Sequence, residues 1–119
     1  MLSTLGKIVR KHRIDNEMKL GELASALNIS AAHMSSIESG RRRATQEILD
    51  GIIVLFKLSA KQADELEMAA IASQEEYRLS MSGQSEVANA AAAGFARALQ
   101  KNALSDKAAK EILDVLMKQ

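Results

Sequence analysis

Residues 19–43 read KLGELASALNISAAHMSSIESGRRR, and this stretch decides the fold of the first half of the chain. Its first part carries an apolar face at helical spacing, made by Leu20, Leu23, Ala24 and Leu27. Asn28 follows, and asparagine tolerates the left-handed conformation that ends helices. Ser30 is then a natural N-cap for a second helix, which directs Met34 and Ile37 inward. The stretch therefore predicts two short helices joined by a tight turn.

The outward face of the second helix is expected to be lined by small side chains, at Ala31, Ala32, Ser35, Ser36 and Ser39. Three consecutive arginines, Arg41–Arg43, follow this helix. Small side chains allow a helix to approach another surface closely, and the arginines place positive charge beside it. We therefore expect this helix to contact another macromolecule.

The composition of the 119 residues favours an all-α protein. The chain has no proline and only three aromatic residues, and it is rich in alanine, leucine, lysine and glutamate. Alternating β-branched runs, which are typical of strands, are scarce. The length suits one domain, or one small domain with an appendage.

The sequence favours a cytoplasmic location. It contains no cysteine, which fits a reducing compartment. The first residues, MLSTLGKIVRKHR, lack the long apolar core and cleavage site of a signal peptide. The longest apolar run, Ile52–Phe56, is far too short to cross a bilayer.

Positive charge is concentrated in the first half of the chain. Residues 1–58 hold nine lysines and arginines against six acidic residues, whereas residues 59–119 hold seven against nine. The net charge of the whole chain is only +1. The basic half is the one that contains the helix pair, so both signals point to the same surface.

Three further helices are expected around this pair. The first is capped by Thr4 and runs to about Asn16, with Leu5, Val9 and Arg13 on one side and His12 near the inner edge. The next is capped by Thr45 and has an inward face of Ile48, Leu49, Ile52, Ile53, Leu55 and Phe56. Gly51 in that helix predicts a close approach to a neighbouring helix. The last opens with the capping box of Ser59 and Gln62, has Leu66, Met68, Ala69 and Ile71 inward, and extends as far as Leu79.

The chain after residue 79 reads as a separate part. Residues 80–85, SMSGQS, are small and polar and predict a linker. A helix over Glu86–Asn102 is expected to carry a stripe of Val87, Ala91, Gly94, Phe95, Ala98 and Leu99. Ser105 caps a final helix, with Ala108, Ala109, Ile112, Leu113 and Leu116 inward. Two helices are too few for a core of their own, so this pair must pack on the first domain or on a second copy.

Three segments carry a resemblance to a known family. They are Glu22–Ala24 (ELA), Asn28–Ser30 (NIS) and Met34–Arg41 (MSSIESGR). Residues from about 5 to 58 resemble the Cro/Xre-type (lambda-repressor-like) helix-turn-helix family of bacterial and phage transcription regulators. The resemblance implies a lambda-repressor-like DNA-binding domain, and with the fifth predicted helix we expect this five-helix domain to span residues 1–79. The pattern of residues, and not the resemblance, predicts the linker over residues 80–85 and a C-terminal helical dimerisation or interaction region over residues 86–119. The resemblance also implies that Arg13 forms a structural ion pair with Glu38.

The family resemblance implies a sequence-specific regulator of transcription, a repressor by family habit, that binds double-stranded DNA with residues 30–39 in the major groove. The expected DNA-binding residues are Lys19, Ser30, Ala31, Ala32, His33, Ser35, Ser36, Ser39, Arg41, Arg42 and Arg43. The chain departs from the family at Leu20, where a phosphate-contacting glutamine or threonine is common, and Lys19 is expected to replace it. Ala31 and Ala32 replace polar residues and can offer only methyl contacts, for example to thymine.

One such domain buries too little surface for tight specific binding, so we expect a homodimer on a palindromic operator. The expected dimerisation residues are Val87, Ala91, Phe95, Leu99, Ile112 and Leu116. Two alternatives stay open. The chain could be the antitoxin of a toxin–antitoxin pair, which represses its own operon and binds a toxin through the C-terminal helices, or a helix-turn-helix used only for protein contacts.

No chemistry other than binding is expected. The carboxylates are scattered over helix surfaces, with no acid–base pair, nucleophile elbow or phosphate-binding loop. His12 and His33 have no carboxylate or cysteine at ligand spacing, so no metal site is expected. We therefore predict neither catalytic residues nor a cofactor.

Overall fold

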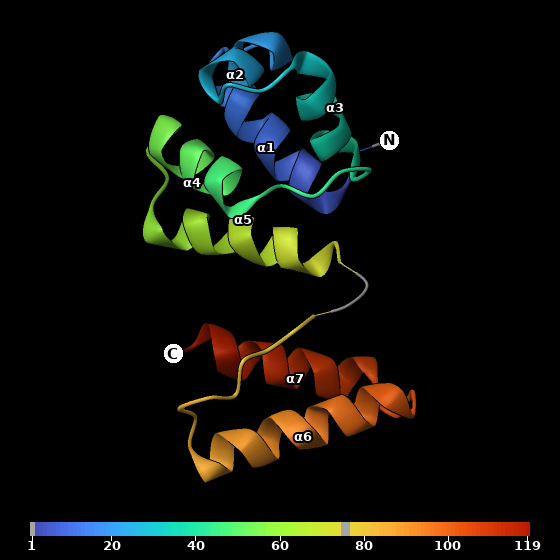
Figure 1. Cartoon of the computed structure of the whole chain (residues 1–119). Coiled ribbons are helices and arrows are strands. Elements are labelled where there is room, and N and C mark those ends of the chain that lie inside the picture. Colours follow the sequence, from blue (N-terminus) through green and yellow to red (C-terminus); the bar gives the residue numbers. More distant parts are fainter. Residues whose placement is uncertain (1, 75–76) are drawn as a thin grey trace. The chain divides into compact units, whose positions relative to one another are not determined.

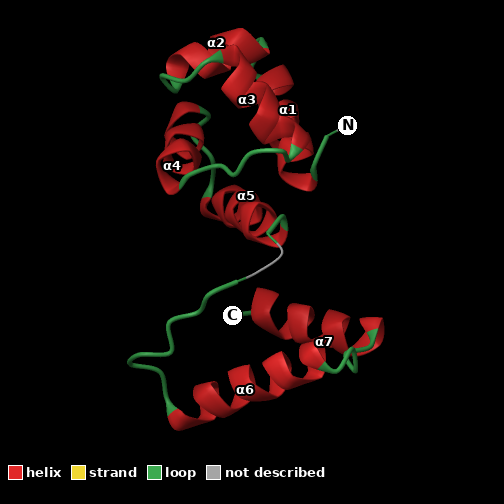
Figure 2. Ribbon diagram, turned by 45° about the vertical axis from the view of Figure 1, so that its right-hand side comes forward, coloured by secondary structure: helices red, strands yellow, loops and turns green. Residues whose placement is uncertain are grey.

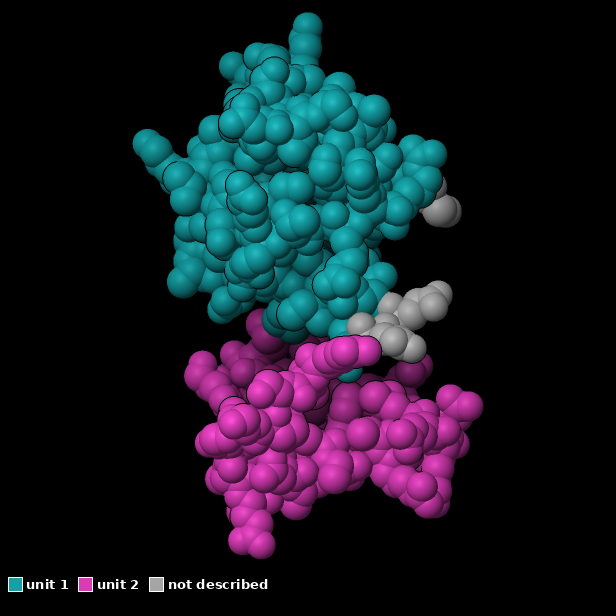
Figure 3. Space-filling model, viewed as in Figure 1, with its two compact units in different colours: residues 1–77 teal, residues 78–119 magenta. Residues whose placement is uncertain are grey.

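The structure is a computed structural model that describes residues 2–74 and 77–119. Within these ranges it contains seven helices and no strand, as Figures 1 and 2 show, and the prediction of an all-α chain is confirmed there. The helices are α1 (Thr4–Asp15), α2 (Leu20–Ala26), α3 (Ala31–Ser39), α4 (Gln46–Leu55), α5 (Ala60–Ala72), α6 (Glu86–Gln100) and α7 (Asp106–Met117). The chain divides into two compact units, residues 1–77 and residues 78–119 (Figure 3).

Unit 1, residues 1–77, is built around an aliphatic core to which all five of its helices contribute. In this unit α2 packs on α3, α1 packs on both α3 and α5, and α4 packs on α5. The buried core residues are Leu5, Val9, Leu23, Ala24, Met34, Ile37, Ile48, Leu49, Ile52, Leu66, Ala69 and Ala70. Of the apolar residues predicted for the helix pair at residues 19–43, Leu23, Ala24, Met34 and Ile37 belong to this core, and Leu20 and Leu27 are partly buried against it.

Hydroxyl side chains cap most of the helices. Ser30 accepts a hydrogen bond from the His33 N–H, and Thr45 accepts one from the Ile48 N–H. Ser105 likewise caps α7, and Ser59 and Gln62 form the predicted capping box at the start of α5. These four predictions are confirmed. The predicted cap of α1 lies one residue too late, because Ser3 accepts from the Gly6 N–H and Thr4 lies inside the helix.

One backbone device joins consecutive helices at four places. A residue with positive φ follows the helix at Glu17, Asn28, Lys57 and Asn102, with φ between 51° and 60°. The N–H of the next residue then donates to the carbonyl five positions back, as Ile29 does to Ala24 at 3.0 Å. This closes the exposed carbonyl end of the helix. The left-handed conformation predicted for Asn28 is confirmed, and the same turn forms at three residues that the sequence did not single out.

Several predicted inward residues of α4 and α5 are exposed. Leu55 is 36% exposed, Met68 42% and Ile71 53%, so these predictions were wrong. In α5 the buried residues Leu66, Ala69 and Ala70 form one narrow stripe, and at 100° per residue Met68 and Ile71 project away from it. The sequence therefore predicted more inward-facing residues on these two helices than the packing of unit 1 buries. Helix α5 also ends at Ala72 and does not reach Leu79.

Unit 2, residues 78–119, holds α6 and α7 and has no buried residue. Helix α6 ends at Gln100, two residues before the predicted end. Of the residues predicted to face inward in α7, Ala108 and Ala109 are half-buried, but Ile112, Leu113 and Leu116 are exposed. The segment from residue 77 to the N-cap Ser85 is not helical, and the predicted linker over residues 80–85 falls within it.

Candidate functional site

Helix α3 is a short helix with well-defined ends. Ser30 caps its beginning, and Gly40 ends it with φ of 83°, in the left-handed conformation that glycine adopts without strain. The N–H groups of Arg41 and Arg42 both donate to the Ser36 carbonyl, at 2.9 and 3.2 Å. The arginine run therefore begins directly where α3 stops and turns away from the helix axis.

The inner face of α3 is completely enclosed by unit 1. Met34 is 0% exposed, Ile37 1% and Glu38 3%. Glu38 is the one buried charged residue in the described ranges. Because burial of an unpaired carboxylate is very unfavourable, its partners decide whether α3 can pack here.

The partner of Glu38 is Arg13 of α1, which makes a two-pronged pair with it. Arg13 Nε donates to Glu38 Oε2 at 3.1 Å, and Nη2 donates to Oε1 at 3.2 Å. The remaining Nη1 donates to the Met18 carbonyl at 3.3 Å. The ion pair implied by the family resemblance is therefore present, and it ties together α1, the turn before α2, and α3.

A second contact between α1 and α3 was missed by sequence reasoning. The N–H and Oγ of Ser3 both donate to the backbone carbonyl of Glu38, at 3.0 and 3.2 Å. Gly6, one turn later, is buried against the same carbonyl, where an added Cβ would overlap the Glu38 oxygen. A glycine within a helical pattern is a signal of such close approach, and it could have indicated this contact.

The outer face of α3 carries small side chains, although fewer are fully exposed than predicted. Ser30, Ala31, Ala32 and Ser35 are exposed, and His33 is half-buried. Ser36 and Ser39 were predicted to face outward but are half-buried. Ser39 lies at the last turn, where its hydroxyl donates to the Ser36 carbonyl at 3.1 Å, so it is partly engaged within the helix.

The basic residues near α3 are exposed but lie in different surroundings. Arg41 Nε donates to Ser39 Oγ at 3.1 Å, which holds this arginine beside the end of α3. Arg42 is exposed in the loop. Lys19 is exposed at the N-cap of α2, where its backbone N–H donates to Glu22 Oε1 at 3.1 Å. Its ammonium group is therefore not required for capping.

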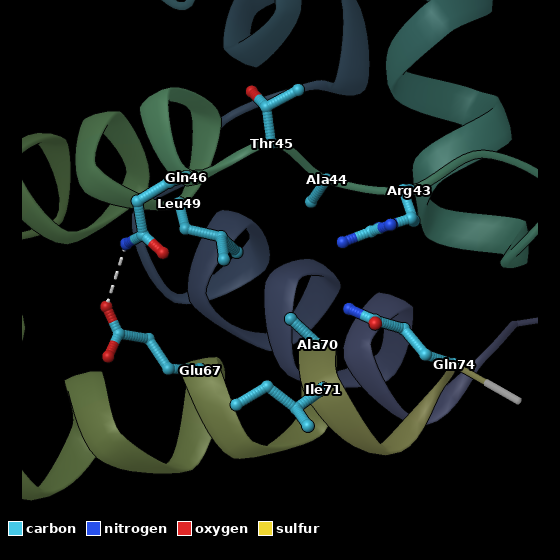
Figure 4. Close-up of a pocket in the computed structure, with 9 residues that line it drawn as sticks. All are labelled: Arg43, Ala44, Thr45, Gln46, Leu49, Glu67, Ala70, Ile71 and Gln74. Carbon is cyan, nitrogen blue, oxygen red and sulfur yellow. Dashed lines mark hydrogen bonds between the residues drawn. The ribbon is translucent and has the colours of Figure 1, made fainter. Parts of the chain in front are cut away.

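Arg43 faces a hollow of about 480 Å³ between the loop after α3 and helices α4 and α5. Figure 4 shows its guanidinium directed into this hollow, with the amide of Gln74 on the opposite side. Gln46 Nε2 donates to Glu67 Oε1 at 3.1 Å across the far end (Figure 4). The structure thus separates Arg43, which turns toward α5, from Arg41, which stays beside α3.

The residues predicted for dimerisation are brought together only as an exposed pair of helices. Val87 is 80% exposed and Leu116 58%, and the remaining members Ala91, Phe95, Leu99 and Ile112 are also exposed. Neighbouring residues cover these apolar side chains only in part, since Phe95 is still 42% exposed and Ile112 38%. The six residues remain predictions as contacts with another chain.

In the described part of the chain, no group of three or more histidine, cysteine, aspartate or glutamate residues is placed to hold a metal ion. The ring of His12 stacks on Phe56 with centroids 6.1 Å apart, which gives His12 the packing role expected for it. No helix among the described residues is both long and apolar enough to span a membrane.

Comparison with known proteins found no matching family model, no matching curated protein and no matching solved structure.

Proposed function

We propose that this chain is a sequence-specific double-stranded DNA-binding regulator of transcription, a repressor that binds a palindromic operator as a homodimer. The observation that carries the proposal is the two-sided character of α3. Its inner face is fixed by buried apolar side chains and by the Arg13–Glu38 pair, while its outer face presents small exposed side chains. A helix presented in this way suits insertion into the major groove.

The exposed residues of α3 suit a particular kind of base recognition. Ala31 and Ala32 offer methyl groups, which contact the methyl group of thymine. Ser35 is exposed and can donate or accept a hydrogen bond at a base edge. With few long polar side chains on this face, part of the specificity is expected to come from the shape and deformability of the DNA.

The surrounding cations would supply affinity by contact with phosphates. Lys19, Arg41 and Arg42 are exposed at the edges of the helix pair. Each cation that neutralises a phosphate releases counterions, so binding should weaken steeply as salt rises. Arg43 points toward α5, and we therefore rank Arg41 above it as a phosphate contact.

The homodimer is supported by the state of unit 2. Its two helices bury no residue and expose a row of apolar side chains that includes Val87, Phe95 and Leu99. Association with the same surface of a second copy would remove these side chains from water and bring two copies of α3 to one DNA site.

The decisive experiment is selection of bound sequences from a pool of random duplexes by the full-length chain. We expect enrichment of a two-fold symmetric site whose half-sites are spaced by about one helical turn or a multiple of it. The Arg41→Gln variant should bind the selected site more weakly and with a shallower salt dependence, whereas the control Lys61→Gln on α5 should bind as wild type. Absence of any enriched sequence, together with binding that ignores salt, would contradict the proposal.

A second candidate, an antitoxin that binds a toxin through α6 and α7, is favoured by the same exposed apolar residues of unit 2. The mass of the complex purified from the native host separates the two. A species made only of the 12.9 kDa chain supports the homodimer. A second, different small protein in stoichiometric amount supports the antitoxin.

A further inference from the structure

A basic hollow lies beside the outer face of α3, and its lining includes a residue of α1 that had no expected role. The hollow measures about 550 Å³, and it is lined by the polar residues Arg10, Arg13, Ser35, Glu38, Ser39 and Arg41 and by the apolar residues Leu2 and Leu20. It is distinct from the hollow that Arg43 faces. Arg10 is the exposed residue of α1 in this lining.

The charges around this hollow are not balanced. Arg13 and Glu38 neutralise one another through their two hydrogen bonds. Arg10 is exposed and has no ion-pair partner among the described residues, where Arg13–Glu38 is the one pair. Arg41 is held to the rim by Ser39. Among the described residues, the hollow therefore carries two guanidinium groups without an acidic partner, one from α1 and one from the loop after α3.

We propose that Arg10 and Arg41 flank a binding notch for one phosphate of the DNA backbone. The proposal rests on the proposed function, because that function places Ser35 of α3 toward the DNA. A strand that borders the major groove would then pass the mouth of the hollow that Ser35 lines. Guanidinium groups bind phosphate oxygens in two-pronged geometry, which suits them to this position better than an ammonium group.

This assignment gives α1 a second role besides bracing. Arg13 and Arg10 lie three residues apart and therefore on neighbouring parts of the same helix surface. Arg13 reaches inward to Glu38 and fixes α3, whereas Arg10 remains at the surface beside α3. The orientation of the recognition helix and one of its backbone contacts would thus come from a single helix turn of α1.

The test is titration of a short fluorescein-labelled DNA duplex with the full-length chain at several salt concentrations. Fluorescence anisotropy measures the fraction of duplex that is bound. Three variants are compared with wild type: Arg10→Gln, Arg10→Lys, and Lys61→Gln as a matched exposed cation on α5. For Arg10→Gln we expect roughly tenfold weaker binding and a salt slope smaller by about 0.9, because one phosphate contact is lost. Arg10→Lys should retain the slope, and Lys61→Gln should match wild type.

The outcomes separate the two proposals. If wild type shows salt-dependent duplex binding and Arg10→Gln retains its slope and affinity, the phosphate notch is wrong and the proposed function stands. If wild type does not bind duplex at all, both are wrong. The thermal unfolding midpoint of Arg10→Gln is expected to equal that of wild type, because the Arg10 side chain is exposed. A lowered midpoint would mean that the variant binds more weakly because it is less folded, and this result would overturn the assignment.

Discussion

Glu38 connects α3 to the rest of unit 1 through two different groups. Its carboxylate binds the guanidinium of Arg13, and its backbone carbonyl accepts hydrogen bonds from the N–H and hydroxyl of Ser3. The first contact is electrostatic and buried, whereas the second is a backbone contact that requires close approach. Substitutions can therefore test the two contacts separately.

Glu38→Ala is expected to lower the free energy of unfolding by roughly 3 kcal/mol, because it leaves the partly buried guanidinium of Arg13 without its partner. Urea unfolding followed by circular dichroism measures the change. The double variant Arg13→Met, Glu38→Leu replaces both charges by apolar groups and should recover most of the loss. If the double variant is less stable than Glu38→Ala, the pair contributes something other than mutual neutralisation.

Gly6→Ala is expected to destabilise unit 1 by roughly 2–4 kcal/mol, since the added Cβ would overlap the Glu38 carbonyl oxygen and separate α1 from α3. Gly21→Ala in α2 is the matched control. An added Cβ at Gly21 has no neighbour within 4 Å. There the substitution should stabilise the helix by about 0.5–1 kcal/mol through helix propensity. Equal effects of both substitutions on the urea midpoint would contradict the close contact at Gly6.

At the residue scale, the sequence was informative where a side chain has a specific chemical role. The caps at Ser30 and Thr45 and the left-handed Asn28 could be predicted because local hydrogen bonding decides them. The contact of Ser3 with Glu38 could not, because it joins backbone groups 35 residues apart. The half-burial of Ser36 likewise depends on how closely the neighbouring elements pack on α3.

At the scale of elements, the repeated left-handed turn explains how short helices follow one another without proline. Lys57 adopts φ of 51° between α4 and α5, and the Leu58 N–H then donates to the Ile53 carbonyl at 3.0 Å. For a residue with a Cβ this conformation is unfavourable, and lysine has no short polar side chain to compensate. The turn is therefore maintained by the packing of the two helices that it joins.

Lys57→Gly is expected to raise the free energy of unfolding by about 0.5–1 kcal/mol, because glycine adopts positive φ without steric strain. Asn28→Gly, at a residue with φ of 60°, should give a smaller gain because asparagine already tolerates the conformation. Thermal unfolding of both variants gives the comparison. A lower midpoint for Lys57→Gly would show that the lysine side chain itself contributes to the turn.

The number and order of the helices in both units can be predicted from apolar spacing and turn residues. The residues at which each helix ends, and the side chains that it buries, can be predicted only in part. The predicted stripe of α5 is too wide because apolar residues such as Ile71 were all assigned to the core. Periodicity shows which side chains are apolar along a helix, and only the neighbouring helices decide how many of them are covered. At Gly51 an added Cβ would lie 2.8 Å from Leu27 Cδ2, which is the end of a flexible side chain and not the backbone of a neighbouring helix. The close helix-to-helix approach predicted at Gly51 therefore stays a prediction.

For the molecule as a whole, the division of buried surface is unequal. Unit 1 has a core of twelve buried apolar residues, whereas unit 2 has none. A pair of helices without a core is marginal in water, and it gains stability by covering its apolar face. The spacing of apolar residues in one chain identifies such a face but does not specify which surface covers it. That a second copy of the chain covers this face is therefore a proposal.

Truncation after Ser80 is expected to give a monomer that still unfolds cooperatively, because unit 1 retains its complete core. Sedimentation equilibrium of the full-length and truncated chains measures the difference. In the full-length chain, Phe95→Asp should dissociate the proposed dimer, because it places a charge in the apolar face of α6. Asn89→Asp, at an exposed polar position of the same helix, should leave the proposed dimer intact. A truncated chain that remains dimeric would place the dimer interface in unit 1.

The two hydrogen bonds from Ser3 to the Glu38 carbonyl affect where a tag can be attached to this protein. Any segment fused ahead of Ser3 would leave unit 1 beside the last turn of α3, close to the arginines at residues 41–43. An affinity tag placed there would lie at the edge of the proposed DNA surface, and a histidine or lysine tag could imitate or block phosphate contacts. A tag after Gln119 is attached to unit 2 and leaves the contact between Ser3 and Glu38 unchanged.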